Sequence, residues 1–548
     1  MNKLLKVLFV TLILNFLSTT LHPQSITKEN IENAERIFGL EFTNAERDSM
    51  LSSLDSQFVN YKHIREVNLN NNVPSAIQFN PIPVGFVFPK AEKEITFSDY
   101  SYTRLPSDRN ELAFYTIGEL AELIRTRQIT STELTKFFLE RLKKYDPTLH
   151  CVITLTEGRA LKHAELMDEE IAEGKYRGML HGIPFGVKDL LATKDYKTTW
   201  GATPYKDQMI DEDATVIKKL EEAGAVLCAK LTLGALAWGD VWFGGMTRNP
   251  WVTTKGSSGS SAGSASSVSA GLLPFAIGTE TWGSIVSPST VCGTTGLRPT
   301  YGRVSRTGAM ALSRSMDKIG TICRSSEDLA IVFNAIKGSD GMDQTLYYLP
   351  FNYEPTIDYG ELKIGYLKND FDKQYDFHTQ DSVTLFKLKE LGAELIPIEL
   401  PSLPVNDIAF ILSAEAGAAF DELTRSNRDD LLVRQIKDAW PNVFRASRFI
   451  PAVEYINANR IRFLLIQQMK ELMNKVDLYI APSWKGDNLL LTNLTGHPCV
   501  VLPNGFSKDG TPTSITFIGR LFDEGRLIAF AKKYQDATDF HKKHPKVF

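Results

Sequence analysis

The sequence is poor in the residues that build metal sites and disulfide frameworks. It has five cysteines and nine histidines in 548 residues. The cysteines lie far apart and form no CxxC pair, so neither a zinc site nor a set of disulfides is indicated. No HExxH motif or other close cluster of His, Asp and Glu suggests a metal ion. We therefore expect no metal, and we interpret the cysteines as buried thiols.

An excess of positive charge is also absent. The chain has 61 Lys and Arg against 65 Asp and Glu, a formal net charge of −4. A protein that binds nucleic acid usually carries a basic patch, so we expect no nucleic-acid partner. A hydrophobic content of 43% and a charged content of 23% are ordinary for a soluble globular protein with a substantial core.

Long apolar runs are confined to the N-terminus, where residues 7–17 follow Lys3 and Lys6. This run is too short to span a bilayer comfortably, and it fits the hydrophobic region of a signal peptide. Ser18 and Thr20 offer small residues for cleavage. An uncleaved anchor or a buried helix is the alternative. We expect residues 1–24 to be removed, and the protein to be periplasmic or secreted without stable membrane insertion.

Residues 25–105 are expected to form an N-terminal helical and extended appendage. Two short helices are predicted up to about Leu54. The first stops at Gly39, and the second begins at a capping box formed by Thr43 and Glu46. Turn-rich, extended sequence follows. This part of the chain carries no catalytic pattern.

Residues 106–548 alternate between amphipathic helices and short apolar strands. Such alternation predicts an α/β fold in which one large mixed sheet is layered between helices. Residues 405–475 are mostly helical in pattern and are expected to form an inserted layer. Their aromatic residues belong either to the core or to the wall of an apolar cleft; they are Phe410, Phe420, Trp440, Phe444 and Phe449.

The most unusual stretch is residues 256–299, which is rich in Gly, Ser and Thr. A flexible linker is the ordinary interpretation of such composition. However, the apolar segment LLPFAIG interrupts it and is typical of a buried strand, and Trp282 lies in the second Gly/Ser/Thr turn. We therefore predict a folded turn system in which backbone N–H groups and hydroxyls converge, as acyl transfer requires.

Three serines compete as the nucleophile. Ser261 lies in a GxSxG pattern, which would need a preceding strand and a later His, for which His497 is the best candidate. Ser315 begins an SxxK pattern that ends at Lys318, without the SDN or KTG partners of penicillin-recognising enzymes. The third candidate is Ser284, in GTETWGSIVSPS.

Lys188 is a candidate general base. It lies in HGIPFGVKDLL, among apolar residues and glycines that allow close packing. Most lysines are solvated surface charges. A lysine buried here would lose its charge easily, because burial disfavours the charged form, and it could then accept a proton.

Three segments taken together resemble the amidase signature family. They are GIPFGVKD with Lys188, GSSAGSASSVSAG with Ser260, and GTETWGSIVSPSTVCGTTGLRPTYGRVS with Ser284. Further similar sequence segments extend the resemblance from about Leu112 to the C-terminus. The resemblance implies a serine hydrolase with a Ser–Ser–Lys triad and no cofactor. Ser284 would be the nucleophile, and Ser260 would pass its proton to neutral Lys188.

The resemblance also implies an oxyanion hole and a structural aspartate. The backbone N–H groups of Thr281, Trp282, Gly283 and Ser284 would hold the oxyanion, and Asp317 would hold the Gly/Ser loops. Two departures from the family stand out. Trp282-Gly283 replaces a common Gly-Gly pair and narrows the acyl side, and Ile285-Val286 stands where many members have an arginine.

The sequence therefore predicts hydrolysis of a small-molecule or peptide amide through a covalent acyl-enzyme, with esters as a further possible class. Three alternatives stay open. They are an α/β-hydrolase-type esterase using Ser261 and His497, a non-catalytic binding protein on an amidase scaffold, and the glutaminase-like subunit of a tRNA amidotransferase. An exported chain would not meet aminoacyl-tRNA. The substrate and the oligomeric state do not follow from the sequence.

Overall fold

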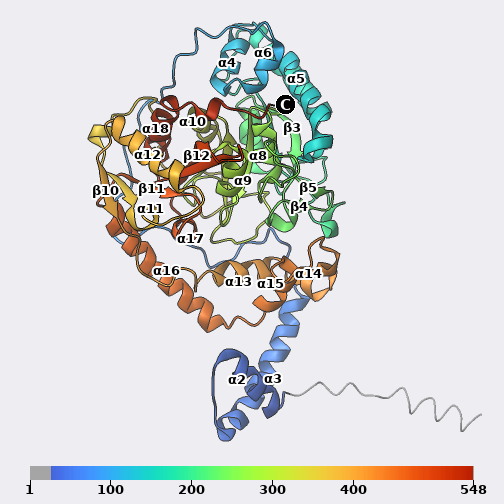
Figure 1. The fold of residues 1–548 in the computed structure, drawn as a ribbon. Helices are drawn as coiled ribbons and strands as arrows, with labels where there is room; N and C mark the ends of the chain where they lie inside the picture. Colours follow the sequence, from blue (N-terminus) through green and yellow to red (C-terminus); the bar gives the residue numbers. More distant parts are fainter. Residues whose placement is uncertain (1–25, 547) are drawn as a thin grey trace, which may run out of the picture. The chain divides into compact units, whose positions relative to one another are not determined.

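The computed structural model describes residues 26–546 and 548, and the chain divides into two compact units (Figure 1). The first unit ends at Asn70, and the second runs over Asn71–Phe548. The expected signal peptide, residues 1–24, lies outside the described residues. The extended residues 71–105, which sequence pattern groups with the appendage, are part of the second unit.

The first unit is a pair of helices, α2 (Lys28–Phe38) and α3 (Asn44–Glu66). Gly39 ends α2 in a left-handed conformation, and Thr43 and Glu46 cap α3 reciprocally, as predicted. The predicted end of the second helix near Leu54 is wrong, because α3 continues to Glu66. Residues 55–66 contain no glycine or proline to stop it, and α3 has no buried residue, so apolar spacing could not show its length.

The second unit is built on a mixed sheet, which confirms the predicted α/β class. Eleven strands of the described chain form it, in the order β1-β3-β2-β6-β8-β7-β12-β13-β11-β9-β10. Two groups are parallel, β3-β2-β6 and β11-β9-β10, and the other pairings are antiparallel. The strands are β1 (Val152–Leu155), β2 (Pro184–Lys188), β3 (Val226–Leu231), β6 (Phe275–Glu280), β7 (Thr295–Arg298), β8 (Lys318–Cys323), β9 (Ile364–Leu367), β10 (Leu395–Ile398), β11 (Leu478–Pro482), β12 (Cys499–Phe506) and β13 (Pro512–Gly519). A separate hairpin pairs β4 (Val241–Trp242) with β5 (Gly245–Met246).

Helices surround this sheet (Figure 1). They are α4 (Ile117–Arg125), α5 (Ser131–Leu149), α6 (Glu157–Ala172), α7 (Thr215–Glu222), α8 (Ala262–Ser269), α9 (Val286–Cys292), α10 (Ser326–Ile336), α11 (Lys368–Phe371), α12 (His378–Glu390), α13 (Phe410–Ala419), α14 (Asp421–Arg425), α15 (Trp440–Ser447), α16 (Ala452–Met473), α17 (Asn488–Thr495) and α18 (Glu524–Asp536). No described helix combines the length and apolar character needed to span a membrane.

Side chains alternate between the two faces of the sheet, as the two-residue period of a strand requires. On β6, Phe275 and Ile277 pack in one core with residues of α10 and α18, whereas Ala276 packs in another with residues of α8. On β12, Val500 belongs to the first core, and Val501 packs with residues of α16 and α17. The central strands are therefore buried on both faces, and their ends are firmly placed.

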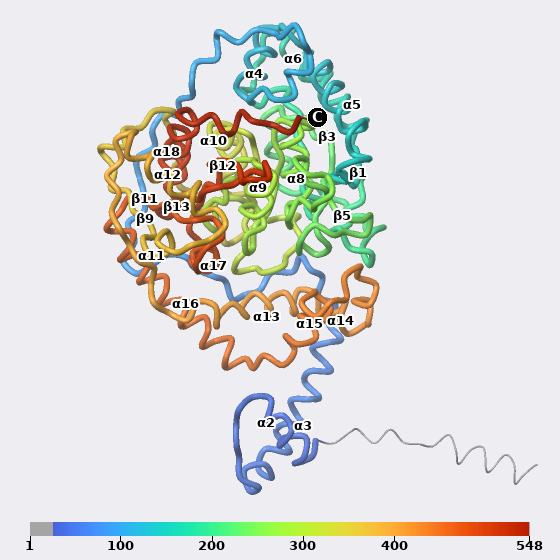
Figure 2. The backbone as a smooth tube through the Cα atoms, in the orientation of Figure 1, coloured from blue at the N-terminus to red at the C-terminus, as the bar shows by residue number. Residues whose placement is uncertain are grey.

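The extended segment 71–105 runs over the second unit (Figure 2). Asn71 exchanges two 2.8 Å hydrogen bonds with the backbone of Ala311. Further along, the Val84 N–H donates to Gln467 on α16, and the Tyr100 hydroxyl donates to Glu327 on α10. This segment thus links the 311 loop to helices on different parts of the unit.

Residues 405–475 contain α13 to α16, in the helical range that the sequence predicts. Phe420 and Trp440 stack on Phe444, with ring centroids 5.3 and 5.1 Å apart, and all three are buried. Phe449 is 57% exposed. Most of these aromatic residues therefore form core between the helices, the first of the two interpretations from sequence.

Candidate active site

Lys188 is the last residue of β2, and its side chain is fully buried. Its amine donates to the Ser260 hydroxyl at 2.7 Å and to the Thr279 hydroxyl at 2.9 Å, and it lies 3.3 Å from the Ser261 hydroxyl. Burial lowers the pKa of Lys188 to about 7, against a smaller opposing effect of Asp317 and Glu280. A large fraction of this amine is therefore neutral at pH 7, as a general base requires.

Ser260 lies just before α8, in the folded Gly/Ser run. The run is not a linker, because α8 is buried along its whole length. Ser260 is itself buried, the Gly259–Ser260 peptide bond is cis, and the Ser261 N–H donates to the Ser284 carbonyl at 3.2 Å. This hydrogen bond joins the segment of Ser260 to the segment of Ser284.

Ser284 lies on the turn between β6 and α9 and is partly exposed, unlike Lys188 and Ser260. Its hydroxyl makes no hydrogen bond within the described chain. The structure thus brings Lys188 and Ser260 into direct contact. It also places the backbone of Ser284 beside Ser261. Among the described residues, no hydrogen bond joins the hydroxyls of Ser260 and Ser284.

Glu280 shapes the turn that carries Ser284. Its buried carboxylate accepts hydrogen bonds from the N–H groups of Ile285 and Val286, at 2.8 and 3.0 Å. It also pairs with buried Arg298 at 2.7 Å and accepts from Asn493. Although burial opposes ionisation, these partners hold the pKa of Glu280 at about 2. The sequence analysis assigns no role to Glu280. The only signal for such a role is the presence of an acidic residue within GTETWGS.

The turn leaves several backbone donors unused. Within the described part of the chain, the N–H groups of Trp282, Gly283 and Ser284 have no protein acceptor. Gly283 has a φ of +85°, which a glycine adopts without strain. Unpaired N–H groups around a partly exposed serine can stabilise a negative oxygen that develops there.

Asp317 ties the same turn to the loop that follows β7. Its carboxylate accepts from the Thr281 hydroxyl at 2.6 Å and from the N–H groups of Leu312 and Ser313, at 2.8 and 2.9 Å. It makes no hydrogen bond to Lys188 in the described chain. These contacts support the structural role that the resemblance implies.

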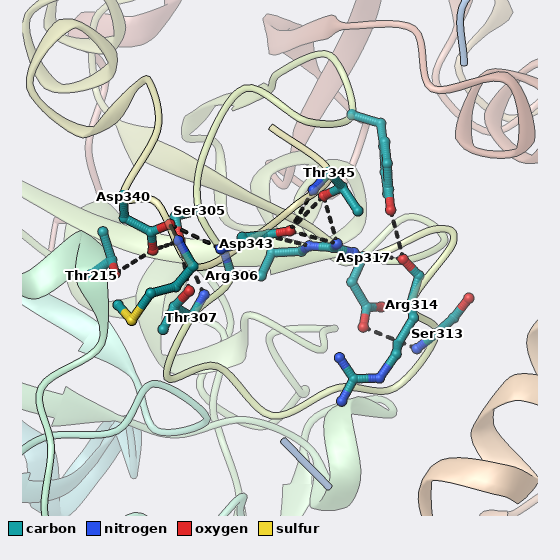
Figure 3. Close-up of polar contacts among 12 residues, drawn as sticks. Thr215, Ser305, Arg306, Thr307, Ser313, Arg314, Asp317, Asp340, Asp343 and Thr345 are labelled. Carbon is teal, nitrogen blue, oxygen red and sulfur yellow. Dashed lines mark hydrogen bonds and ion pairs between the residues drawn. The ribbon is translucent and has the colours of Figure 1, made fainter. Parts of the chain in front are cut away.

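A row of polar contacts continues through that loop (Figure 3). Arg306 donates to the Arg314 carbonyl at 2.6 Å and pairs with Asp343 at 3.1 Å. Asp340, at the other end of the row, accepts from the Thr215 hydroxyl at 2.7 Å. This network braces the loop residues that bind Asp317.

The other two candidate nucleophiles have different partners. The Ser261 hydroxyl donates to the Thr279 carbonyl at 3.1 Å, and His497 contacts the Thr495 hydroxyl at 2.8 Å. No hydrogen bond joins Ser261 to His497 among the described residues. Burial, with Arg298, lowers the pKa of His497 to about 3, so this imidazole is a poor base. The SxxK residues also have other partners: Lys318 donates to the Met316 carbonyl, and the Ser315 hydroxyl accepts from Arg462.

A strained loop borders the Gly/Ser run. Leu236 and Ala237 both adopt left-handed backbone angles, with φ of +51° and +62°, which costs about 1–3 kcal/mol for each non-glycine residue. A Cβ placed on Gly259 would lie 1.9 Å from the Gly239 carbonyl oxygen, so the two segments are in backbone contact. Strain of this kind gathers at functional sites. Sequence reasoning gave this loop no role.

Two other features bear on cofactors and ligands. The five cysteines are free and buried, which confirms their interpretation as buried thiols. Among the described residues, no group of three or more His, Cys, Asp or Glu side chains could hold a metal ion. A surface hollow of about 610 Å³ lies beside the C-terminal end of α9, lined in part by Lys255, Tyr375 and Trp484, and its lining includes none of the predicted triad.

Comparisons with known proteins assign the chain to a family. The model of the Amidase family matches residues 133–490. One subunit of the glutamyl-tRNA(Gln) amidotransferase of Coxiella burnetii is 33% identical over 481 residues, which cover 79% of this chain and 99% of that relative. The peptide amidase of Stenotrophomonas maltophilia is 28% identical, with a TM-score of 0.70, and covers 77% of this chain and 97% of that one.

A bacterial aryl acylamidase shares the fold, with a TM-score of 0.72 at 21% identity, over 80% of this chain and 99% of that one. The family match spans more than half of the chain, and the solved structures reproduce the sheet and its surrounding helices. The chain belongs to the amidase signature family, whose chemistry is the cleavage of amide C–N bonds.

Proposed function

We propose that this protein is an amidohydrolase that cleaves a linear amide through a Ser284–Ser260–Lys188 triad. One observation carries the proposal. A fully buried lysine amine, whose pKa burial lowers to about 7, donates a 2.7 Å hydrogen bond to a serine in the segment that also contacts the Ser284 backbone. A base in this state is what a serine hydroxyl needs to become a nucleophile.

In the proposed first step, the Ser284 oxygen attacks the amide carbon. Its proton passes to the Ser260 oxygen while Ser260 gives its own proton to neutral Lys188. The same path in reverse protonates the departing amine as the C–N bond breaks. Water then attacks the acyl-enzyme by the same relay and releases the acid. Catalytic hydrogen bonds often form fully only in the substrate complex, and the mechanism requires the Ser260 and Ser284 hydroxyls to come together in that complex.

The unpaired N–H groups of Trp282, Gly283 and Ser284 are proposed to hold the oxyanion, with Thr281 as a further backbone donor. Loss of one such donor typically slows acyl transfer by about 100-fold or more. The Glu280 carboxylate supports this role indirectly, because it fixes the next two N–H groups of the turn.

We propose a free-standing hydrolase rather than part of an amidotransferase. Residues 7–17 and the two lysines before them favour an exported protein, which would act on small-molecule or peptide amides without a nucleic-acid partner. The amidotransferase relative supports amide chemistry in general. A direct check is the size of the mature protein and its location after expression in a bacterial host.

The function is tested with a panel of aryl amides and peptide amides, by measuring amine release. We expect the wild-type protein to hydrolyse at least one amide, and Ser284→Ala and Lys188→Met to lose about 100-fold or more of kcat/KM. Ser266→Ala is the matched control. Ser266 lies on α8, the helix that follows Ser260, and its hydroxyl donates to the Arg248 carbonyl and not to the triad. Activity that survives Ser284→Ala would contradict the proposal.

A further inference from the structure

Arg434 is a partly exposed cation in the helical layer of residues 405–475, between α14 and α15. Its side chain is 33% exposed, and its guanidinium lies 5.0 Å from the Trp238 ring centroid. It forms an ion pair with Asp240 at 3.8 Å, a separation that is beyond hydrogen-bond distance. In the described part of the chain this guanidinium donates no hydrogen bond, so its N–H groups can bind a ligand in addition to the ion pair with Asp240.

Arg434 lies over the loop that contacts the Gly/Ser run. A Cβ placed on Gly239 would lie 3.0 Å from the Arg434 Nη1 atom, and the Gly239 carbonyl is packed against Gly259. Trp440 holds this loop from the same helical layer, because its indole N–H donates to the Leu236 carbonyl at 3.0 Å. One loop backbone therefore separates Arg434 from the residue that precedes Ser260.

A second path leads from Arg434 toward the nucleophile. Asp240 accepts a 3.0 Å hydrogen bond from the Ser258 N–H, and the Ser258 hydroxyl bonds to that of Ser287 on the first turn of α9. Asp240, Ser258 and Ser287 are each partly exposed. Arg434 and Ser284, at the two ends of this path, are partly exposed as well. Partial exposure shared by neighbouring segments is what a solvent-accessible rim would show.

The positions after the nucleophile offer no cation. Ile285 and Val286 are fully buried and apolar. An anionic group on the substrate would have to be bound by a residue from another element. Guanidinium groups suit this task, because their planar fork can bind a carboxylate through two parallel hydrogen bonds.

We propose that Arg434 binds a carboxylate on the amine portion of the substrate, so that the preferred substrates are N-acylated amino acids. This rests on the proposed function. In that mechanism the departing amine takes its proton from Ser260, so the amine portion lies on the Ser260 side. Arg434 lies on the same side, because it packs against Gly239 and the Gly239 carbonyl contacts Gly259, the residue before Ser260.

The test compares two series of N-phenylacetyl amines. One series ends in a carboxylate and the other in a neutral primary alcohol, with about two to eight carbons between the amide nitrogen and the terminal group. Initial rates of amine release give kcat and KM for the wild type and for Arg434→Gln, Arg434→Lys and Arg428→Gln. Arg428 is the matched control, because it also lies over an aromatic ring, that of Tyr205, but contacts Pro204 and not the 234–240 loop.

We expect the wild type to prefer the best carboxylate substrate by about tenfold or more in kcat/KM. Arg434→Gln should remove this preference by raising KM, with kcat and the neutral series nearly unchanged, and Arg434→Lys should keep part of it. Arg428→Gln should leave both series unchanged. The preference should also weaken as salt is added, because part of the attraction is electrostatic and the site is partly exposed.

The inference is overturned if the wild type prefers the neutral series at every chain length, or if Arg434→Gln slows both series equally. It is also overturned if only amides without a carboxylate are hydrolysed. Failure of the wild type on every amide, simple aryl amides included, would instead overturn the proposed function on which the inference rests.

Discussion

At the scale of single residues, the candidate site contains two buried ionisable groups, and burial has a different outcome for the charge of each. Lys188 has hydroxyls and a carbonyl as hydrogen-bond partners but no carboxylate, so burial lowers its pKa to about 7. Glu280 has Arg298 and two backbone N–H groups as partners, so its pKa falls to about 2 despite burial. The first group can exchange a proton near neutral pH, whereas the second stays charged and holds the turn.

The pKa of Lys188 predicts how activity depends on pH. Only the neutral amine accepts a proton, so kcat/KM should rise about tenfold per pH unit below pH 7 and become constant above it. A pH–rate profile of the free enzyme measures this directly. A profile that is flat between pH 5 and 7, or that falls as pH rises through 7, would contradict the role of Lys188 as the base.

Replacing Glu280 tests whether it holds the turn. Glu280→Gln leaves buried Arg298 without its anion, and breaking a buried pair of this kind costs about 3–5 kcal/mol of the free energy of unfolding. Because the folded pKa of Glu280 is depressed, its stabilising contribution is present above the ordinary glutamate pKa and is lost as pH falls toward 2. Urea unfolding at pH 7 and pH 3 should therefore show a larger difference between wild type and variant at pH 7.

The same two residues show what sequence can and cannot predict. Lys188 is predicted as a base from its apolar, glycine-containing neighbours and from the resemblance to the family motif, and the structure shows that its side chain is buried. Glu280 lies in that motif, but its partners Arg298 and Asn493 come from other elements, and Asn493 is more than 200 positions away. Pairing across such separations is decided by the fold, and no local pattern records it. Arg434 and Asp240 are a second example.

At the scale of secondary structure, short apolar strands were predictable because the sheet is buried on both faces. The short apolar segments PFGVK and VLCAKL form β2 and β3, in agreement with the predicted alternation of helices and apolar strands. The α3 helix was predicted too short, because a helix without a buried face gives no apolar period. The strained turn at Leu236 was missed because neither Leu236 nor Ala237 is a residue that favours a positive φ.

The contact between α15 and that turn leads to a further prediction. Trp440→Phe keeps an aromatic ring to stack on Phe444 but removes the hydrogen bond to the Leu236 carbonyl. We expect a loss of about 0.5–1.5 kcal/mol in stability and a several-fold decrease in kcat/KM, because the turn packs against the Gly/Ser run. Phe449→Ala, at an exposed position in the same layer, is the control and should change neither. Equal effects of the two substitutions would argue against a specific anchor.

At the scale of the whole molecule, all the groups of the candidate site come from the second unit. Lys188 is supplied by β2, Ser260 by the segment before α8, and Ser284 by the turn after β6. Because β2 and β6 are neighbouring parallel strands, their carboxyl ends meet at one edge of the sheet. The order of strands therefore explains how residues about 100 positions apart come together.

Two truncations test how far the second unit is independent. Removal of residues 1–70 keeps Asn71 and every contact described for the site, so kcat/KM of the truncated protein should stay within about twofold of wild type. Removal of residues 1–97 also removes the Asn71–Ala311 and Val84–Gln467 hydrogen bonds and should lower the melting temperature by several degrees. Loss of folding on removal of residues 1–70 would show that the second unit requires the first in order to fold.

The most direct test of the central claim is to identify the serine that reacts. The purified protein is treated with a fluorophosphonate, and the modified residue is mapped by mass spectrometry in the wild type, Lys188→Met and His497→Ala. The account predicts a label on Ser284 that is retained in His497→Ala and falls about 100-fold in rate in Lys188→Met. A label on Ser261 that depends on His497 would contradict it.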